Sequence, residues 1–142
     1  MGGAAILLME IGSNMDAIGS ADRLASWTGL CPGNNESAGK KKKAKIRKGN
    51  PYERRLFCEF AQAAGTTTSV FKLKFQSLVP RRGHKRAIVA IAHKMLRTIT
   101  HMLKRGEHYR DSSVDYEELA AKRNAPRWIK SLKKFGLIPT PA

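Results

Sequence analysis

The chain has 142 residues, with 27 Lys and Arg against 11 Asp and Glu, and a formal net charge of +16 at pH 7. Hydrophobic residues make up 42% of the sequence, enough for the core of one domain. The longest apolar runs, residues 4–9 and 87–92, are too short to cross a bilayer, and no signal peptide is indicated. A chain this basic attracts polyanions, of which nucleic acid is the commonest and an anionic membrane surface the alternative.

Local patterns predict a nearly all-helical chain. A short apolar helix over residues 4–10 is followed by a turn at residues 12–14. Ser20 is a suitable N-cap for a second helix that carries Trp27 on its core face. Two short helices joined by a Gly-containing turn favour either a helix-hairpin-helix that holds phosphates or a packed pair without a ligand.

A basic loop follows these helices. Between Gly39 and Gly49 there are seven cations and no anion. These cations are Lys40, Lys41, Lys42, Lys43, Lys45, Arg47 and Lys48. The preceding residues 32–39 are polar and rich in turn formers, and they include one hydroxyl nucleophile, Ser37. Such a loop suits a polyanionic backbone, and we expect it to be disordered when free and ordered when bound; the alternative is a solvated charged segment.

The start of the next helix is the sharpest local signal. Asn50 is a good N-cap, Pro51 suits the first helical position, and Glu53 completes a spacing that resembles a capping box. We expect this helix to end at Gly65. Its positive dipole end faces the basic loop, which favours anions there.

Residues 70–78 alternate like a strand but also fit a helix, and we expect a helix because no partner strand occurs elsewhere. Pro80 is expected to end it, and residues 81–86 form a second basic turn. Residues 87–104 have the clearest amphipathic pattern, which stops at Gly106.

The last part of the chain has a different composition. A short helix is expected over residues 115–123, and Pro126 starts a basic amphipathic segment. The expected fold is therefore an all-α bundle of about five to seven helices with a helix-hairpin-helix-like start, a basic loop and a basic C-terminal tail. We place one domain at residues 1–116 and the tail at residues 117–142.

Other candidate site residues flank the basic loop or repeat its chemistry. Candidates for nucleic-acid binding besides the seven loop cations are Asn50, Arg54, Arg55, Arg81, Arg82, Lys85 and Arg86. Tyr52 and Trp128 are the aromatic residues best suited to stack on bases. The four histidines lack the spacing of zinc-binding helices and neither cysteine is placed to help, so no metal site is predicted.

Five motifs occur along the chain in a specific order. They are LASWTGLCPGNNESAGK from residue 24, RKGN from residue 47, RRL from residue 54, RAIVAIAHKML from residue 86 and YRD from residue 109. Their order and spacing resemble the C-terminal domain of bacterial transposases of the insertion sequence 110, 116 and 902 family. The resemblance covers residues 4–116.

This resemblance implies a mechanism. Members of the family have an N-terminal resolvase-like nuclease domain with a DEDD set of metal-binding acids, and a C-terminal domain with a serine in a Ser-x-Gly-Lys context. A structured bridge RNA pairs with target and donor DNA. The serine attacks the DNA backbone to form a phosphoserine that leads to strand exchange, and Ser37 is the matching residue.

The chain departs from the family by starting almost at the C-terminal domain, and its acids make no DEDD set. We therefore expect a truncated copy that is inactive alone, binds no cofactor, and depends on Mg²⁺ held in the absent nuclease domain. The expected partners are DNA, bridge RNA and a second copy or a full-length transposase, with no membrane, in the bacterial cytoplasm at the nucleoid. The alternative is a basic helical nucleic-acid-binding module without chemistry, and an upstream nuclease-domain reading frame would distinguish the two.

Overall fold

The computed structural model describes residues 2–12, 15–31, 33, 36–37, 39–41, 45–111 and 114–138. Within these residues there are seven α-helices and one pair of two-residue strands. The helices are α1 (Gly3–Ile11), α2 (Met15–Ile18), α3 (Ala21–Trp27), α4 (Pro51–Thr66), α5 (Val70–Arg82), α6 (His84–Arg105) and α7 (Tyr116–Lys134), and the strands are β1 (Glu36–Ser37) and β2 (Lys40–Lys41). The expected small all-α bundle is confirmed. The four-residue helix α2, between the two helices expected at the start, was not predicted.

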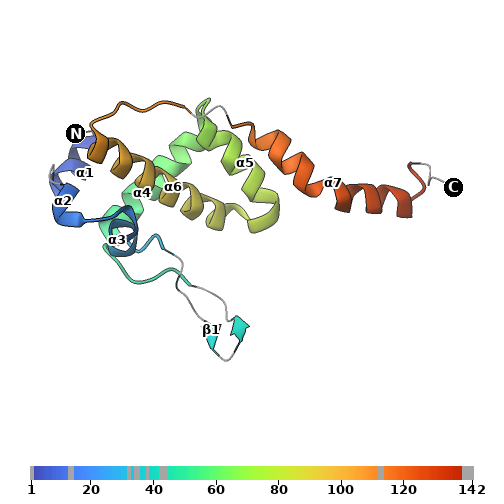
Figure 1. Ribbon diagram of the computed structural model, residues 1–142, viewed down its shortest axis with the longest axis horizontal. Helices are drawn as coiled ribbons and strands as arrows, with labels where there is room; N and C mark the ends of the chain where they lie inside the picture. The colour runs from blue at the N-terminus through green and yellow to red at the C-terminus, as the bar shows by residue number, and fades with distance from the viewer. Residues whose placement is uncertain are drawn as a thin grey trace.

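The core lies where α4, α5 and α6 pack on one another and α3 covers α6 (Figure 1). Phe57 and Ala61 of α4 meet Ile91 and Leu96 of α6, and all four side chains are fully buried. Each large apolar side chain buried in this way stabilises the fold by about 1.5–3 kcal/mol. The amphipathic pattern of residues 87–104 therefore predicted the central helix correctly, although α6 begins three residues earlier.

Side-chain caps fix where the helices begin. The Ser20 hydroxyl accepts a hydrogen bond from the backbone N–H of Arg23 (3.3 Å), and the Asn50 side chain accepts one from Tyr52 (3.0 Å). Both predicted caps are confirmed. The capping-box role predicted for Glu53 is wrong, because the backbone N–H of Asn50 donates instead to the carbonyl oxygen of Trp27 at 2.8 Å.

Two predicted helix ends and one predicted turn are also wrong. Helix α4 continues through Gly65 to Thr66. Pro80 lies inside α5 although it has no N–H to donate to the carbonyl one turn earlier, and α5 continues to Arg82, where the N–H of Gly83 donates to the Val79 carbonyl. Because Gly83 alone separates α5 from α6, the basic turn expected over residues 81–86 is formed by two helix ends.

Helix α7 is one continuous helix rather than a short helix and a separate basic segment. Pro126 lies inside it, and Asp115 caps its start by accepting hydrogen bonds from the N–H groups of Glu117 and Glu118. It packs against α5 near its N-terminus and then extends away from the bundle (Figure 1). None of its described residues is buried.

The YRD motif ties the chain after α6 back to α5. The Tyr109 hydroxyl donates to Asp111, whose other carboxylate oxygen accepts from the backbone N–H of Val70 at 3.4 Å. The Tyr109 ring stacks on Phe71 with ring centroids 6.0 Å apart. Burial, followed by the hydrogen bond to Asp111, raises the pKa of Tyr109 to about 12. The contacts of this motif therefore hold the fold together.

None of the helices in the described parts of the chain combines the length and apolarity needed to span a membrane.

Candidate nucleic-acid interface

The loop that carries Ser37 contains a small antiparallel hairpin. Glu36 lies opposite Lys41 and Ser37 lies opposite Lys40, with Gly39 in the left-handed region at φ +73°. In Figure 1 the hairpin projects from the bundle, away from the helices. The backbone therefore pairs the candidate nucleophile with the first lysine of the basic run. The side chains of these four residues, and all of Lys42 and Lys43, lie outside the described part of the chain.

Two backbone segments form the neck of this loop. The N–H of Gly33 donates to the carbonyl oxygen of Lys45 at 2.9 Å, and the N–H of Asn50 donates to that of Trp27 at 2.8 Å. The end of α3 and the start of α4 are thereby joined at the point where the loop leaves the bundle. The hairpin is thus held by main-chain contacts on both sides of its base.

Glycine makes this neck possible. A Cβ atom on Gly49 would lie 2.3 Å from the backbone nitrogen of Gly29 and 2.5 Å from the carbonyl oxygen of Trp27. A Cβ on Gly33 would lie 2.8 Å from the carbonyl oxygen of Lys45. Because all these neighbours are backbone atoms, a side chain at either position would force the two segments apart.

The described cations of the neck are exposed and carry no counter-charge. Lys45, Arg47 and Lys48 are all exposed. The three ion pairs among the described residues lie elsewhere: Arg55 with Glu59 (3.0 Å), Arg97 with Asp22 (3.5 Å) and Lys122 with Glu118 (2.5 Å). The neck is therefore a concentration of positive charge that no acid in the described part of the chain neutralises.

The first turns of α4 extend this positive surface. Arg54 is half-buried and Arg55 is exposed, and the positive end of the helix dipole lies at the same place. Asn50 is committed to the cap through its side-chain oxygen. Of the residues predicted here, Arg54 therefore adds charge, Arg55 is paired with Glu59, and Asn50 positions the helix end on the neck.

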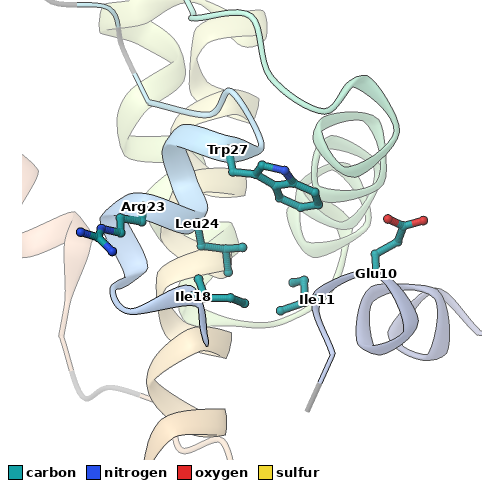
Figure 2. A pocket seen from close by; sticks show the side chains of 6 residues that line it. All are labelled: Glu10, Ile11, Ile18, Arg23, Leu24 and Trp27. Atoms are coloured by element: carbon teal, nitrogen blue, oxygen red, sulfur yellow. The ribbon is translucent and has the colours of Figure 1, made fainter. Parts of the chain in front are cut away.

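Two exposed aromatic rings flank the neck. Trp27 is 44% exposed, so its predicted place in the core is wrong, and Tyr52 is 81% exposed. Helix α3 ends at Trp27, and the ring covers the rim of a cavity of about 270 Å³ whose apolar lining is Ile11, Ile18 and Leu24 (Figure 2). Helical spacing gave no signal that distinguishes a ring at this rim from a ring in the core.

The second basic cluster lies at the same end of the bundle. Lys104 donates to the carbonyl oxygen of Gly19, and Arg97 pairs with Asp22, so α3 runs antiparallel along α6. The C-terminal end of α3, where the neck begins, therefore points toward the N-terminal half of α6. The exposed side chains at this corner of α5 and α6 are Arg81, Arg82, Lys85 and Arg86. Figure 1 likewise places the corner and the hairpin on one side of the bundle.

A buried acid lies close to the neck and was not singled out as a site residue from sequence. Glu53 is 1% exposed, and its Oε2 atom has no hydrogen-bond partner. Burial raises its pKa, and the charge of Glu10 raises it further.

Across the bundle, burial lowers the pKa of His93, and Arg97 adds to the effect. No three His, Cys, Asp or Glu side chains among the described residues are placed to hold a metal ion.

Comparison with known families gives one match. The model of the Transposase IS116/IS110/IS902 family matches residues 2–76. This span is 75 of the 142 residues and contains α1 to α4, the hairpin, the neck and half of α5. No curated protein and no solved structure matches the chain.

Proposed function

Because the chain belongs to the Transposase IS116/IS110/IS902 family and so has a role in transposition, we propose that it binds the nucleic acids of the transposition complex through its neck and hairpin. The observation that carries the proposal is the set of exposed, unneutralised cations Lys45, Arg47 and Lys48 on a glycine-closed neck. The cations of the α5–α6 corner lie at the same end of the bundle and extend the surface.

The chemistry of this surface fits phosphates better than base edges. Lys and Arg side chains on phosphates position a protein along a strand without specifying sequence. Binding releases the counter-ions condensed on the nucleic acid, so affinity falls steeply with salt. Trp27 and Tyr52 add two exposed rings on which unpaired bases can stack. We therefore propose binding to structured RNA and DNA with little sequence preference.

Within that complex we propose Ser37 as the nucleophile of strand exchange, as the family resemblance implies. Its hydroxyl oxygen forms a bond to phosphorus, the bond from phosphorus to one sugar oxygen breaks, and the departing oxygen takes up a proton. The hydroxyl proton passes to a base. Lysines of the hairpin balance the charge that develops on the phosphate oxygens. We assign the base and the divalent metal to the nuclease domain of the family, since no described residues form a set of metal ligands.

Replacing two cations of the neck tests the binding proposal. The variant Arg47→Gln/Lys48→Gln removes one Arg and one Lys that have no ion-pair partner. Its control, Arg97→Gln/Lys122→Gln, removes the same residue types from two exposed ion pairs. Each phosphate contact contributes about 0.9 to the slope of log affinity against log salt on duplex DNA. We therefore expect the neck variant to reduce the slope by about 1.8 and the control to change it little.

The measurement is a set of binding titrations with labelled duplex DNA and structured RNA at several salt concentrations. Affinity is expected to fall similarly for all sequences, because phosphates carry no sequence information. A wild-type affinity that does not depend on salt would show that the electrostatic account is wrong. Equal effects of the neck variant and its control on the salt slope would also show that the electrostatic account is wrong.

A further inference from the structure

A second basic site lies between α5 and α7. It is a cleft of about 370 Å³, hereafter the α5–α7 cleft. Its polar lining consists of Lys74, Ser77, Arg81 and Arg82 from α5, and Tyr116 and Arg123 from α7. No Asp or Glu is among the residues that line it. Four cations from two helices therefore converge on one hollow.

Tyr116 is held in this cleft by two lysines. The Nζ atom of Lys94 donates a hydrogen bond to its hydroxyl and lies 4.7 Å from the centre of its ring. Lys74 lies over the same ring at 5.0 Å. Burial raises the pKa of Tyr116, but the hydrogen bond from Lys94 and the charges of both lysines outweigh this effect and lower it. The start of α7 is thus held by cation–π contacts to α5 through Lys74 and to α6 through Lys94.

The charge of this cleft is not neutralised by the described chain. None of the three described ion pairs includes a cation that lines it. Of the two acids in the first turn of α7, Glu118 is paired with Lys122 instead. Like charges held together repel one another, and a bound anion offsets the repulsion. We therefore expect the cleft to bind an anion, whose charge would offset the repulsion between these cations.

The donors present suit phosphate groups in particular. Two adjacent Arg side chains offer planar forks that match phosphate oxygens, and Arg123 approaches from the opposite wall. The hydroxyl of Ser77 lies in the same lining, but it donates its proton to the carbonyl oxygen of Lys74 at 2.8 Å, so the cations are the donors that carry the argument. Arg81 and Arg82 also belong to the corner at the neck end of the bundle. A strand bound at the neck can therefore pass over the corner to the cleft.

We propose that the α5–α7 cleft binds phosphodiester groups of the nucleic-acid strand that the neck holds, so that α7 acts as a clamp. The inference rests on the proposed nucleic-acid binding. It adds a site that lies almost wholly beyond residue 76, where the family match ends. It also assigns binding roles to Lys74, Tyr116 and Arg123, which the sequence did not indicate.

The test compares two double variants in the same salt titrations. Lys74→Gln/Arg123→Gln removes one cation from each wall of the cleft. Lys72→Gln/Lys122→Gln removes the same charge from the same two helices, at positions that do not line the cleft. We expect the cleft variant to reduce the salt slope by about 1.8 on duplex DNA and the control to leave it unchanged. Since Lys74 also contacts Tyr116, the single variant Arg123→Gln, at an exposed position, is expected to reduce the slope by about 0.9.

Amide chemical shifts provide a second readout. Adding an unlabelled oligonucleotide to the wild-type chain is expected to shift the amide signals of Ser77 and Arg82, and to shift them less in the cleft variant. Shifts with inorganic phosphate but none with the oligonucleotide would overturn the proposal in favour of a small-anion site. If the neck variant lowers the slope while Lys74→Gln/Arg123→Gln and Arg123→Gln do not, the cleft inference fails and the proposed function stands. A salt-independent wild type would refute both.

Discussion

Replacing Gly49 by alanine is expected to open the neck of the basic loop. The added Cβ would lie 2.3 Å from the Gly29 nitrogen and 2.6 Å from its Cα. Real Cβ atoms essentially never approach other atoms so closely. Because these neighbours are backbone, no rotation of a side chain can relieve the clash, and the two segments must separate.

The cost follows from what that separation breaks. Overpacking a tight site costs about 1–3 kcal/mol. The hydrogen bond from Asn50 to Trp27, which joins α4 to α3, contributes about 1 kcal/mol more. We therefore expect Gly49→Ala to lower the free energy of unfolding by roughly 2–4 kcal/mol. For a chain of this size that is a fall in Tm of roughly 8–16 °C.

The assay is thermal unfolding followed by circular dichroism, with Gly65→Ala as the matched control. Gly65 lies inside α4, and a Cβ there would meet only the Phe75 ring at 3.6 Å, an ordinary contact. Alanine in place of a helical glycine stabilises by about 0.5–1 kcal/mol. The same substitution is therefore expected to raise Tm at residue 65 and to lower it at residue 49.

Equal Tm values for the two variants would refute this reasoning, since they would mean that the segments at the neck do not approach as closely as described. A second consequence can be checked in the same samples. If the neck positions the cations, Gly49→Ala should also weaken nucleic-acid binding at temperatures where it is still folded, whereas Gly65→Ala should not.

Two further predictions concern Glu53 and Ser37. Because the pKa of Glu53 is raised in the folded chain, the native state keeps this proton to higher pH than the unfolded state does, and stability should fall as pH rises above about 4.5 through the folded pKa. Denaturant titrations from pH 4 to 8 should show that Glu53→Gln loses this pH dependence and is more stable than wild type at neutral pH. The control Glu59→Gln, which removes one partner of an exposed ion pair, should behave like wild type. A Glu53→Gln variant that is less stable than wild type at neutral pH would contradict the argument. With a family nuclease domain, bridge RNA, donor and target DNA and magnesium restored, a denaturant-resistant protein–DNA adduct should form with wild type and Ser26→Ala but not with Ser37→Ala. An adduct that survives Ser37→Ala would show that another residue is the nucleophile, and no adduct with wild type would favour a binding module without chemistry.

The sequence predicted the features that depend on neighbouring residues. The repeat of apolar positions over residues 87–104 predicted α6, and Ser20 and Asn50 predicted two helix starts, because a helix and its cap are formed within a few residues. Charge composition indicates polyanion binding without reference to packing, and this binding stays a prediction. The five motifs led to the family that the comparison then confirmed over residues 2–76.

Helix ends at Gly and Pro were less predictable, because tertiary packing decides whether such a residue stops a helix. Helix α4 continues one residue past Gly65, and α5 continues two residues past Pro80. Pro126 lies inside α7, which the sequence had divided. A Gly or Pro inside a helix costs about 1–3 kcal/mol relative to Ala, and the free energy of packing contacts elsewhere in the fold can exceed this cost.

Only the tertiary structure decided which distant residues meet. The sequence gives no sign that Gly29 and Gly49 pass within van der Waals distance, or that Trp27 lies at a rim while Glu53 is buried. The α5–α7 cleft joins Lys74 to Arg123, 49 positions apart in the numbering. A periodic pattern shows which face of a helix is apolar but not which element covers it, so contacts between helices are fixed by the packing of the whole chain.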